Sequence, residues 1–150
     1  MNNNTATGNV ELVVELLQKT RNFAPIEELT PLFHRFLSLS SENLKSLPPE
    51  IIPALSDTLY QRILSPTPVP GKCQVFSDLL RMCQRIGESS AAQRDLLLRQ
   101  GLSGTLILLS QRLEVGNPTP KKELLSTQRT LWSTALSLLN GTTLFCKYVY

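Results

Sequence analysis

The segment from Cys73 to Leu113 constrains the fold of this 150-residue chain more than any other. Its residues are typical of three consecutive short helices, separated by a polar break after Glu88 and by Gly101. Helices shorter than about 15 residues are marginal in water unless an apolar face is packed against something else. The segment therefore predicts one unit of a stacked helical array.

Composition favours an all-α chain. The sequence contains 29 Leu against 6 Ile and 7 Val. Leucine keeps its rotamer freedom in a helix, whereas β-branched residues favour strands. A chain of 150 residues is also long enough to bury one sizeable core, so we expect a single domain.

Caps and apolar spacing predict about eight to nine helices in one domain, residues 9–150, after a disordered lead-in at residues 1–8. Asn9 is expected to cap the first helix. Thr30-Pro31 is expected to interrupt or restart the second, because the residue before proline avoids the α region. The helices are expected at residues 9–22, 25–38, 50–64, 72–87, 90–100, 103–113 and 120–139, with a short turn at 40–46 and a further start at 143–150.

The C-terminal half carries the clearest boundary signals. Gly87 is expected to end one helix, and Ser90 with Gln93 has the spacing of a reciprocal capping box. Gly101 fits a left-handed helix terminus. A Pro-rich loop at residues 65–71 joins irregular helical hairpins at 9–64 to the better-formed units at 72–150.

The stretch from Ala92 to Leu102, AQRDLLLRQGL, followed by Leu106, Leu108 and Leu109, resembles the first and second helices of an armadillo repeat. The helix ending before Gly141 looks like the next unit's third helix, with Trp132 placed similarly to Phe76, and Thr143 onward looks like the start of another unit. The resemblance, which extends to HEAT-like repeats, implies a right-handed α-solenoid of two and a half to three units.

The sequence departs from the peptide-binding members of that family at one position. Those proteins carry an asparagine in the third helix that bonds the backbone of an extended peptide. Met82 and Leu138 stand at the corresponding positions here. Two apolar residues favour burial, or contact with an apolar partner helix, over capture of an extended peptide.

No catalytic or metal-binding pattern stands out. Cys73, Cys83 and Cys146 match no zinc spacing and favour a reducing compartment, and His34 has no second ligand near it in sequence. We interpret Cys83 and Trp132 as core residues and His34 as structural. A small enzyme using Cys73, beside Lys72, or His34 is the least favoured hypothesis. The sequence predicts no cofactor, metal or small-molecule substrate.

The leading hypothesis is a non-enzymatic protein-interaction scaffold or adaptor in the cytoplasm, the nucleus or both, because no signal peptide or membrane span is evident. A net charge of +3 is too small to predict nucleic-acid binding. If the units stack, Arg81, Arg85 and Arg129 share the concave surface of successive third helices, which suits an acidic partner; an ordinary solvated face is the competing interpretation.

The C-terminal end offers a second docking surface. Phe145, Tyr148 and Tyr150 begin an apolar helix with no following partner, which predicts docking or self-association there. The alternative function is a compact helical-bundle adaptor that binds an amphipathic partner helix in an apolar groove. An elongated shape favours the solenoid, and a compact one favours the bundle.

Overall fold

The computed structural model describes residues 2–65, 72–114 and 121–139, and the regular secondary structure in these ranges is entirely helical. The expected all-α class is therefore confirmed. All of the expected Pro-rich loop at 65–71 except Ser65, and the helix start expected at 143–150, lie outside the described residues. The eight described helices are α1 (Asn2–Arg21), α2 (Ile26–Leu37), α3 (Ser41–Lys45), α4 (Ile51–Leu64), α5 (Lys72–Ser89), α6 (Ala91–Arg99), α7 (Leu102–Glu114) and α8 (Lys121–Leu139).

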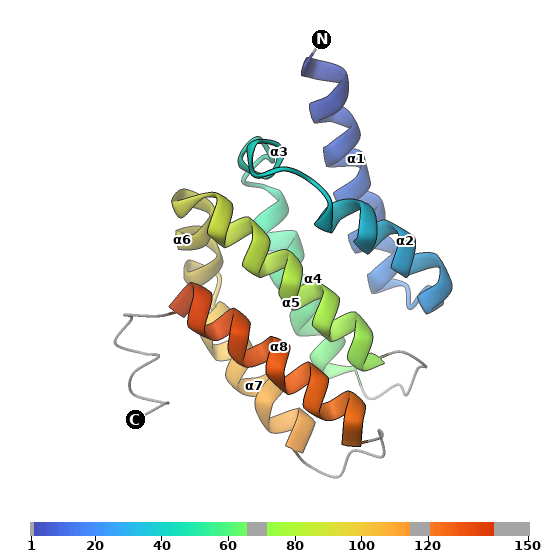
Figure 1. Ribbon diagram of the computed structural model, residues 1–150, viewed down its shortest axis with the longest axis vertical. Helices are drawn as coiled ribbons and strands as arrows, with labels where there is room; N and C mark the ends of the chain where they lie inside the picture. The colour runs from blue at the N-terminus through green and yellow to red at the C-terminus, as the bar shows by residue number, and fades with distance from the viewer. Residues whose placement is uncertain (1, 66–71, 115–120, 140–150) are drawn as a thin grey trace.

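Helix contacts recur along the chain at a spacing of three helices. α1 packs against α4 and α4 against α7, while α2 packs against α5 and α5 against α8. The most extensive of these pairings joins α5 and α8, which lie side by side and run in the same direction (Figure 1). Short α3 and α6 precede α4 and α7 and both contact α5.

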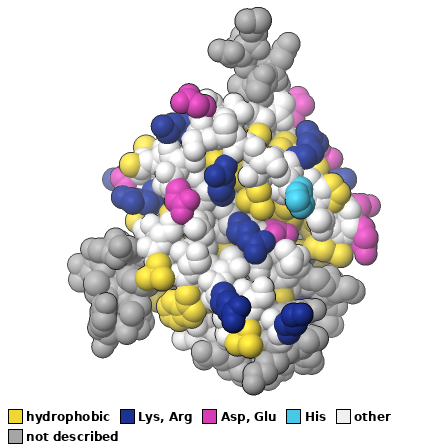
Figure 2. All heavy atoms as spheres, viewed as in Figure 1, with side chains coloured by type: hydrophobic (Ala, Val, Ile, Leu, Met, Phe, Trp, Pro, Cys, Tyr) yellow, Lys and Arg dark blue, Asp and Glu magenta, His cyan; other side chains and the backbone are white. Residues whose placement is uncertain are grey.

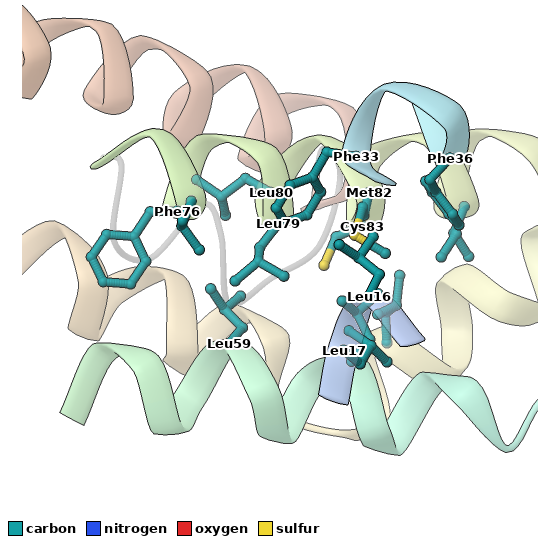
Figure 3. Close-up of a cluster of buried hydrophobic side chains, with 14 of the residues drawn as sticks. Leu16, Leu17, Phe33, Phe36, Leu59, Phe76, Leu79, Leu80, Met82 and Cys83 are labelled. Atoms are coloured by element: carbon teal, nitrogen blue, oxygen red, sulfur yellow. The ribbon is translucent and has the colours of Figure 1, made fainter. Parts of the chain in front are cut away.

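α5 forms the centre of the core. It is buried on nearly every side because α2, α3, α4, α6 and α8 all pack against it. Figure 3 shows side chains from α1, α2 and α4 meeting those of α5, among them Leu16, Phe33, Leu59, Leu79 and Cys83. One continuous hydrophobic cluster therefore joins both halves of the described chain.

Gly87 does not end a helix, contrary to the sequence prediction, because α5 continues to Ser89. The glycine instead lies buried where α5 meets α8. A Cβ atom at this position would be 2.3 Å from Cδ2 of Leu138, far inside van der Waals contact. The missing side chain thus permits a close approach between two helices rather than a chain reversal.

Two other predicted boundaries are wrong. α1 begins at Asn2, so residues 2–8, expected to be a disordered lead-in, are helical and Asn9 is not the cap. α2 passes through Pro31 without interruption. Proline removes one helical hydrogen bond to the carbonyl of residue 27. Both positions are exposed, so water can satisfy that carbonyl.

The α5–α6 junction confirms half of the predicted capping box. The Gln93 backbone N–H donates to Ser90 Oγ at 3.3 Å, as expected for an N-cap serine. The Gln93 side chain does not reach back; its amide donates to the carbonyl of Leu47 at 2.8 Å and ties α6 to the loop before α4. Gly101 has φ +87°, which confirms the predicted left-handed terminus.

Candidate functional site

The sulfur and imidazole groups do not assemble a reactive centre in the described part of the chain. Cys73 and Cys83 are both buried, and burial raises the pKa of the Cys83 thiol to about 12. Cys83 therefore behaves as a small apolar residue, as predicted. His34 is exposed on α2, and no described group of three or more His, Cys, Asp or Glu side chains is arranged to hold a metal ion.

Arg81 is exposed on the outer side of α5, next to a buried carboxylate. Its Nη1 atom lies 3.4 Å from Oδ1 of Asp78, whose side chain is only 7% exposed. Burial raises the pKa of Asp78, although the Gln74 amide, Arg81 and His34 each act in the opposite direction. The guanidinium of Arg81 thus compensates Asp78, and the Arg81 side chain still has nearly half its surface in water.

Arg85, one turn further along α5, is half-buried and has a structural contact. Its Nη2 donates to the backbone carbonyl of Leu39, between α2 and α3. Its Nε is buried without a hydrogen-bond partner. Arg85 therefore links the α2–α3 connection to α5. Less of its guanidinium is available to a ligand than in Arg81.

Trp132 is not a core residue, contrary to the sequence prediction. Its side chain is 49% exposed, whereas Phe76, expected at the equivalent place on α5, is 4% exposed. Trp132 lies with Leu125 and Leu136 on the outer side of α8, where they line an open depression of about 520 Å³. Arg129, also exposed, lines the same depression, together with Gln128 and Ser133.

Buried threonines determine which side of α8 faces outward. Thr127 Oγ1 donates to the carbonyl of Cys73 at 3.2 Å, and the hydroxyls of Ser77 and Thr127 are also 3.2 Å apart. Thr134 donates to the carbonyl of Thr130 at 2.8 Å and lies 3.3 Å from Oε1 of Gln84. Because this polar side is turned toward α5, the side of α8 that carries Leu125, Trp132 and Leu136 is directed to solvent.

A further contact joins the C-terminal parts of α5 and α8. Ser137 Oγ donates to Oε1 of Glu88 at 2.7 Å, and Gln84 donates to the same oxygen at 3.0 Å. These hydrogen bonds lower the pKa of Glu88. The α5–α8 pair is therefore held by polar contacts along its length as well as by the packing at Gly87.

The two apolar residues that stand where a peptide-binding asparagine was expected are both buried. Met82 is inaccessible and Leu138 is 2% exposed. Burial was one of the two outcomes that the sequence favoured for them. The predicted docking residues Phe145, Tyr148 and Tyr150 lie outside the described residues.

Basic side chains gather over α5 and α8, on the face shown in Figure 2, with hydrophobic side chains next to them along α8. Of the predicted arginines, Arg81 on α5 and Arg129 on α8 are exposed and Arg85 is half-buried. Sequence reasoning missed the exposed positions of Leu125 and Leu136. Their heptad spacing with Arg129 and Trp132 is the sequence signal that identifies the stripe.

Comparison with known proteins adds no relative: no protein-family model, no curated protein and no solved structure matches the chain. Among the described helices, none combines the length and the apolar character needed to cross a membrane.

Proposed function

We propose that the chain is a non-enzymatic protein-interaction scaffold built as a right-handed solenoid of armadillo or HEAT type. The observation that carries the proposal is the recurrence of packing at a spacing of three helices, through α1, α4 and α7 and through α2, α5 and α8. A linear array of helical units produces such nearest-neighbour contacts and offers an extended surface on each side.

The proposed binding surface is the side formed by α2, α5 and α8. Arg81 on α5 and Arg129 on α8 carry its exposed guanidinium groups. Arginine recognises carboxylates through a planar fork of donors, so the surface suits an acidic segment of a partner protein. We place this partner in the cytoplasm or the nucleus, in keeping with the free buried thiols of Cys73 and Cys83.

A quantitative capture experiment tests this surface. The full chain carrying R81S and R129S is compared with wild type and with R99S, which removes an exposed arginine from α6. Candidate partners are cross-linked, identified by mass spectrometry and then tested as purified proteins. We expect the double variant to lose an acidic partner that R99S retains. Retention of every purified partner by the double variant would contradict the proposed surface.

The ionic character of the contact gives a second readout. Binding of the purified partner is expected to weaken as salt is raised, because exposed charge pairs are screened over about 10 Å at 0.1 M ionic strength. The double variant should show a smaller salt dependence than wild type. The same slope for both proteins would show that Arg81 and Arg129 do not contribute.

A compact bundle adaptor that binds one amphipathic helix is the second candidate. The open apolar depression on α8, lined by Leu125, Trp132 and Leu136, is the observation that favours it. Small-angle X-ray scattering separates the two architectures. An elongated particle supports the solenoid, and a compact particle with a radius of gyration near 15 Å, as expected for 150 residues, supports the bundle.

A further inference from the structure

The outer side of α8 carries an apolar stripe with nothing packed on it in the described residues. α8 packs mainly against α5 and α7, which leaves a third side open. Leu125, Trp132 and Leu136 are 45%, 49% and 57% exposed on that side. Large apolar side chains clustered in this way mark an interaction surface more often than scattered ones do.

The stripe has heptad spacing. Leu125, Arg129, Trp132 and Leu136 follow one another at steps of four, three and four residues, which places them in a line along a helix. The line covers about three turns, or roughly 16 Å of helix axis. A second helix lying along α8 would contact all four side chains.

The stripe is also complementary to itself. A twofold axis through the bond between Thr130 and Leu131 exchanges Leu125 with Leu136 and Arg129 with Trp132. It also exchanges Gln128 with Ser133, the two other residues that line the depression. Each exchange brings together groups that attract: two leucines, a guanidinium and an indole ring, or an amide and a hydroxyl. Twofold interfaces require this kind of self-complementary patch.

We infer that this surface binds a second copy of the chain, with the two α8 helices antiparallel. An antiparallel pair places Arg129 over Trp132 of the other copy, where the guanidinium and the indole ring attract each other through a cation–π contact. A parallel pair would place Arg129 against Arg129 and lose that contact. The inference does not depend on the proposed scaffold function.

The interface is small. Six residues from each copy line it, against the roughly 20–30 residues a side of a standard interface. We therefore expect a weak dimer with a dissociation constant on the order of 100 µM. Sedimentation velocity of the full chain from about 10 µM to about 1 mM covers this range. A wild-type chain that stays monomeric throughout would overturn the inference.

Two substitutions of Trp132 test the register. Both remove the indole and add a charge at a half-exposed position, so helical content, checked by circular dichroism, should stay unchanged. W132R places two arginines opposite each other and should weaken the dimer at least about tenfold. W132E places a carboxylate opposite Arg129 and should retain the dimer in the antiparallel register. Equal loss of the dimer in both variants would exclude the antiparallel register. An unchanged dimer in both variants would exclude this surface as the interface.

A mixing experiment tests the charge pairing between positions 129 and 132 separately from any apolar association that persists between the substituted surfaces. Combining W132R with the double variant R129E/W132E gives two chains whose own pairs repel but whose mixed pair attracts. We expect a heterodimer in the mixture and monomers in each separate sample.

The variant F145S/Y148S separates the α8 surface from the C-terminal segment. It should dimerise like wild type; loss of its dimer would assign self-association to the C-terminal segment and overturn the inference. Failure of partner capture, by contrast, would affect only the proposed scaffold function.

Discussion

Replacing Gly87 by alanine tests the close approach of α5 and α8. The new Cβ would lie 2.3 Å from Leu138 Cδ2, whereas carbon atoms in contact are separated by about 3.5–4.0 Å. The tip of Leu138 must therefore move by more than about 1 Å within a core where this side chain is only 2% exposed. Overpacking of this kind destabilises by about 1–3 kcal/mol.

Helix propensity acts in the opposite direction. Alanine in a helix interior is more favourable than glycine by about 0.5–1 kcal/mol, because glycine loses more conformational entropy on folding. The two effects leave a net loss of about 1 kcal/mol in the free energy of unfolding of G87A, or about 2–4 °C in Tm for a chain of this size. Urea denaturation followed by circular dichroism measures it.

Gly104 provides the matched control. It lies inside α7, and a Cβ there would meet nothing within 4 Å. G104A should therefore gain only the higher helix propensity of alanine, which stabilises the protein by about 0.5–1 kcal/mol. If G87A is stabilised as much as G104A, Gly87 is not required for packing and the reasoning is refuted.

A double-mutant cycle with Leu138 isolates the contact. L138A alone should destabilise by about 2–5 kcal/mol, because it leaves a cavity beside Gly87. In G87A/L138A the new methyl group enters that space and no longer clashes. The double variant should therefore be more stable than the sum of the single effects predicts, with a coupling of about 1–2 kcal/mol. Additive effects would show that the two side chains do not meet.

Three further predictions follow from individual residues. G101A should destabilise by about 1–2 kcal/mol in urea denaturation, because alanine at φ +87° is strained; unchanged stability would show that the terminus relaxes without strain. Burial raises the pKa of Asp78, so the fold disfavours its ionised form. The free energy of unfolding of wild type relative to D78N should therefore fall as pH rises above 3.8, the ordinary pKa of an aspartate. A difference that does not change with pH would contradict this. In a C146S variant, mass mapping should find Cys83 unalkylated at neutral pH until the chain is denatured, because burial raises the pKa of its thiol to about 12; rapid native labelling would contradict its burial.

The features that could be predicted from the sequence are those determined locally. Leucine content gave the all-α class, and the positions of Ser90 and Gly101 gave two helix termini that the structure confirms. A cap depends on residues three or four positions away, which the sequence displays directly. The all-helical class and most helix positions could therefore be predicted without knowing how the helices pack.

Features that depend on packing could not be predicted in the same way. A glycine near a helix end serves equally as a terminus or as a point of close approach, and only the position of Leu138 distinguishes the two for Gly87. The Gln93 side chain had a local partner available but donates to Leu47, which lies far away in sequence. Tertiary contacts of this kind override local signals that are otherwise sound.

The candidate interaction surface depended on the rotation of one helix. The apolar residues of α8, which include Trp132 and Leu136, form one broad arc, so hydrophobic periodicity alone does not indicate which part of that arc is buried. The two helices approach closely at Gly87, and elsewhere along the same contact Thr127 and Thr134 face α5, where their hydroxyls find partners. Because the threonine side of α8 faces α5, Trp132 lies on the open side together with Arg129. The packing that stabilises the α5–α8 pair is thus also what exposes the stripe proposed for self-association.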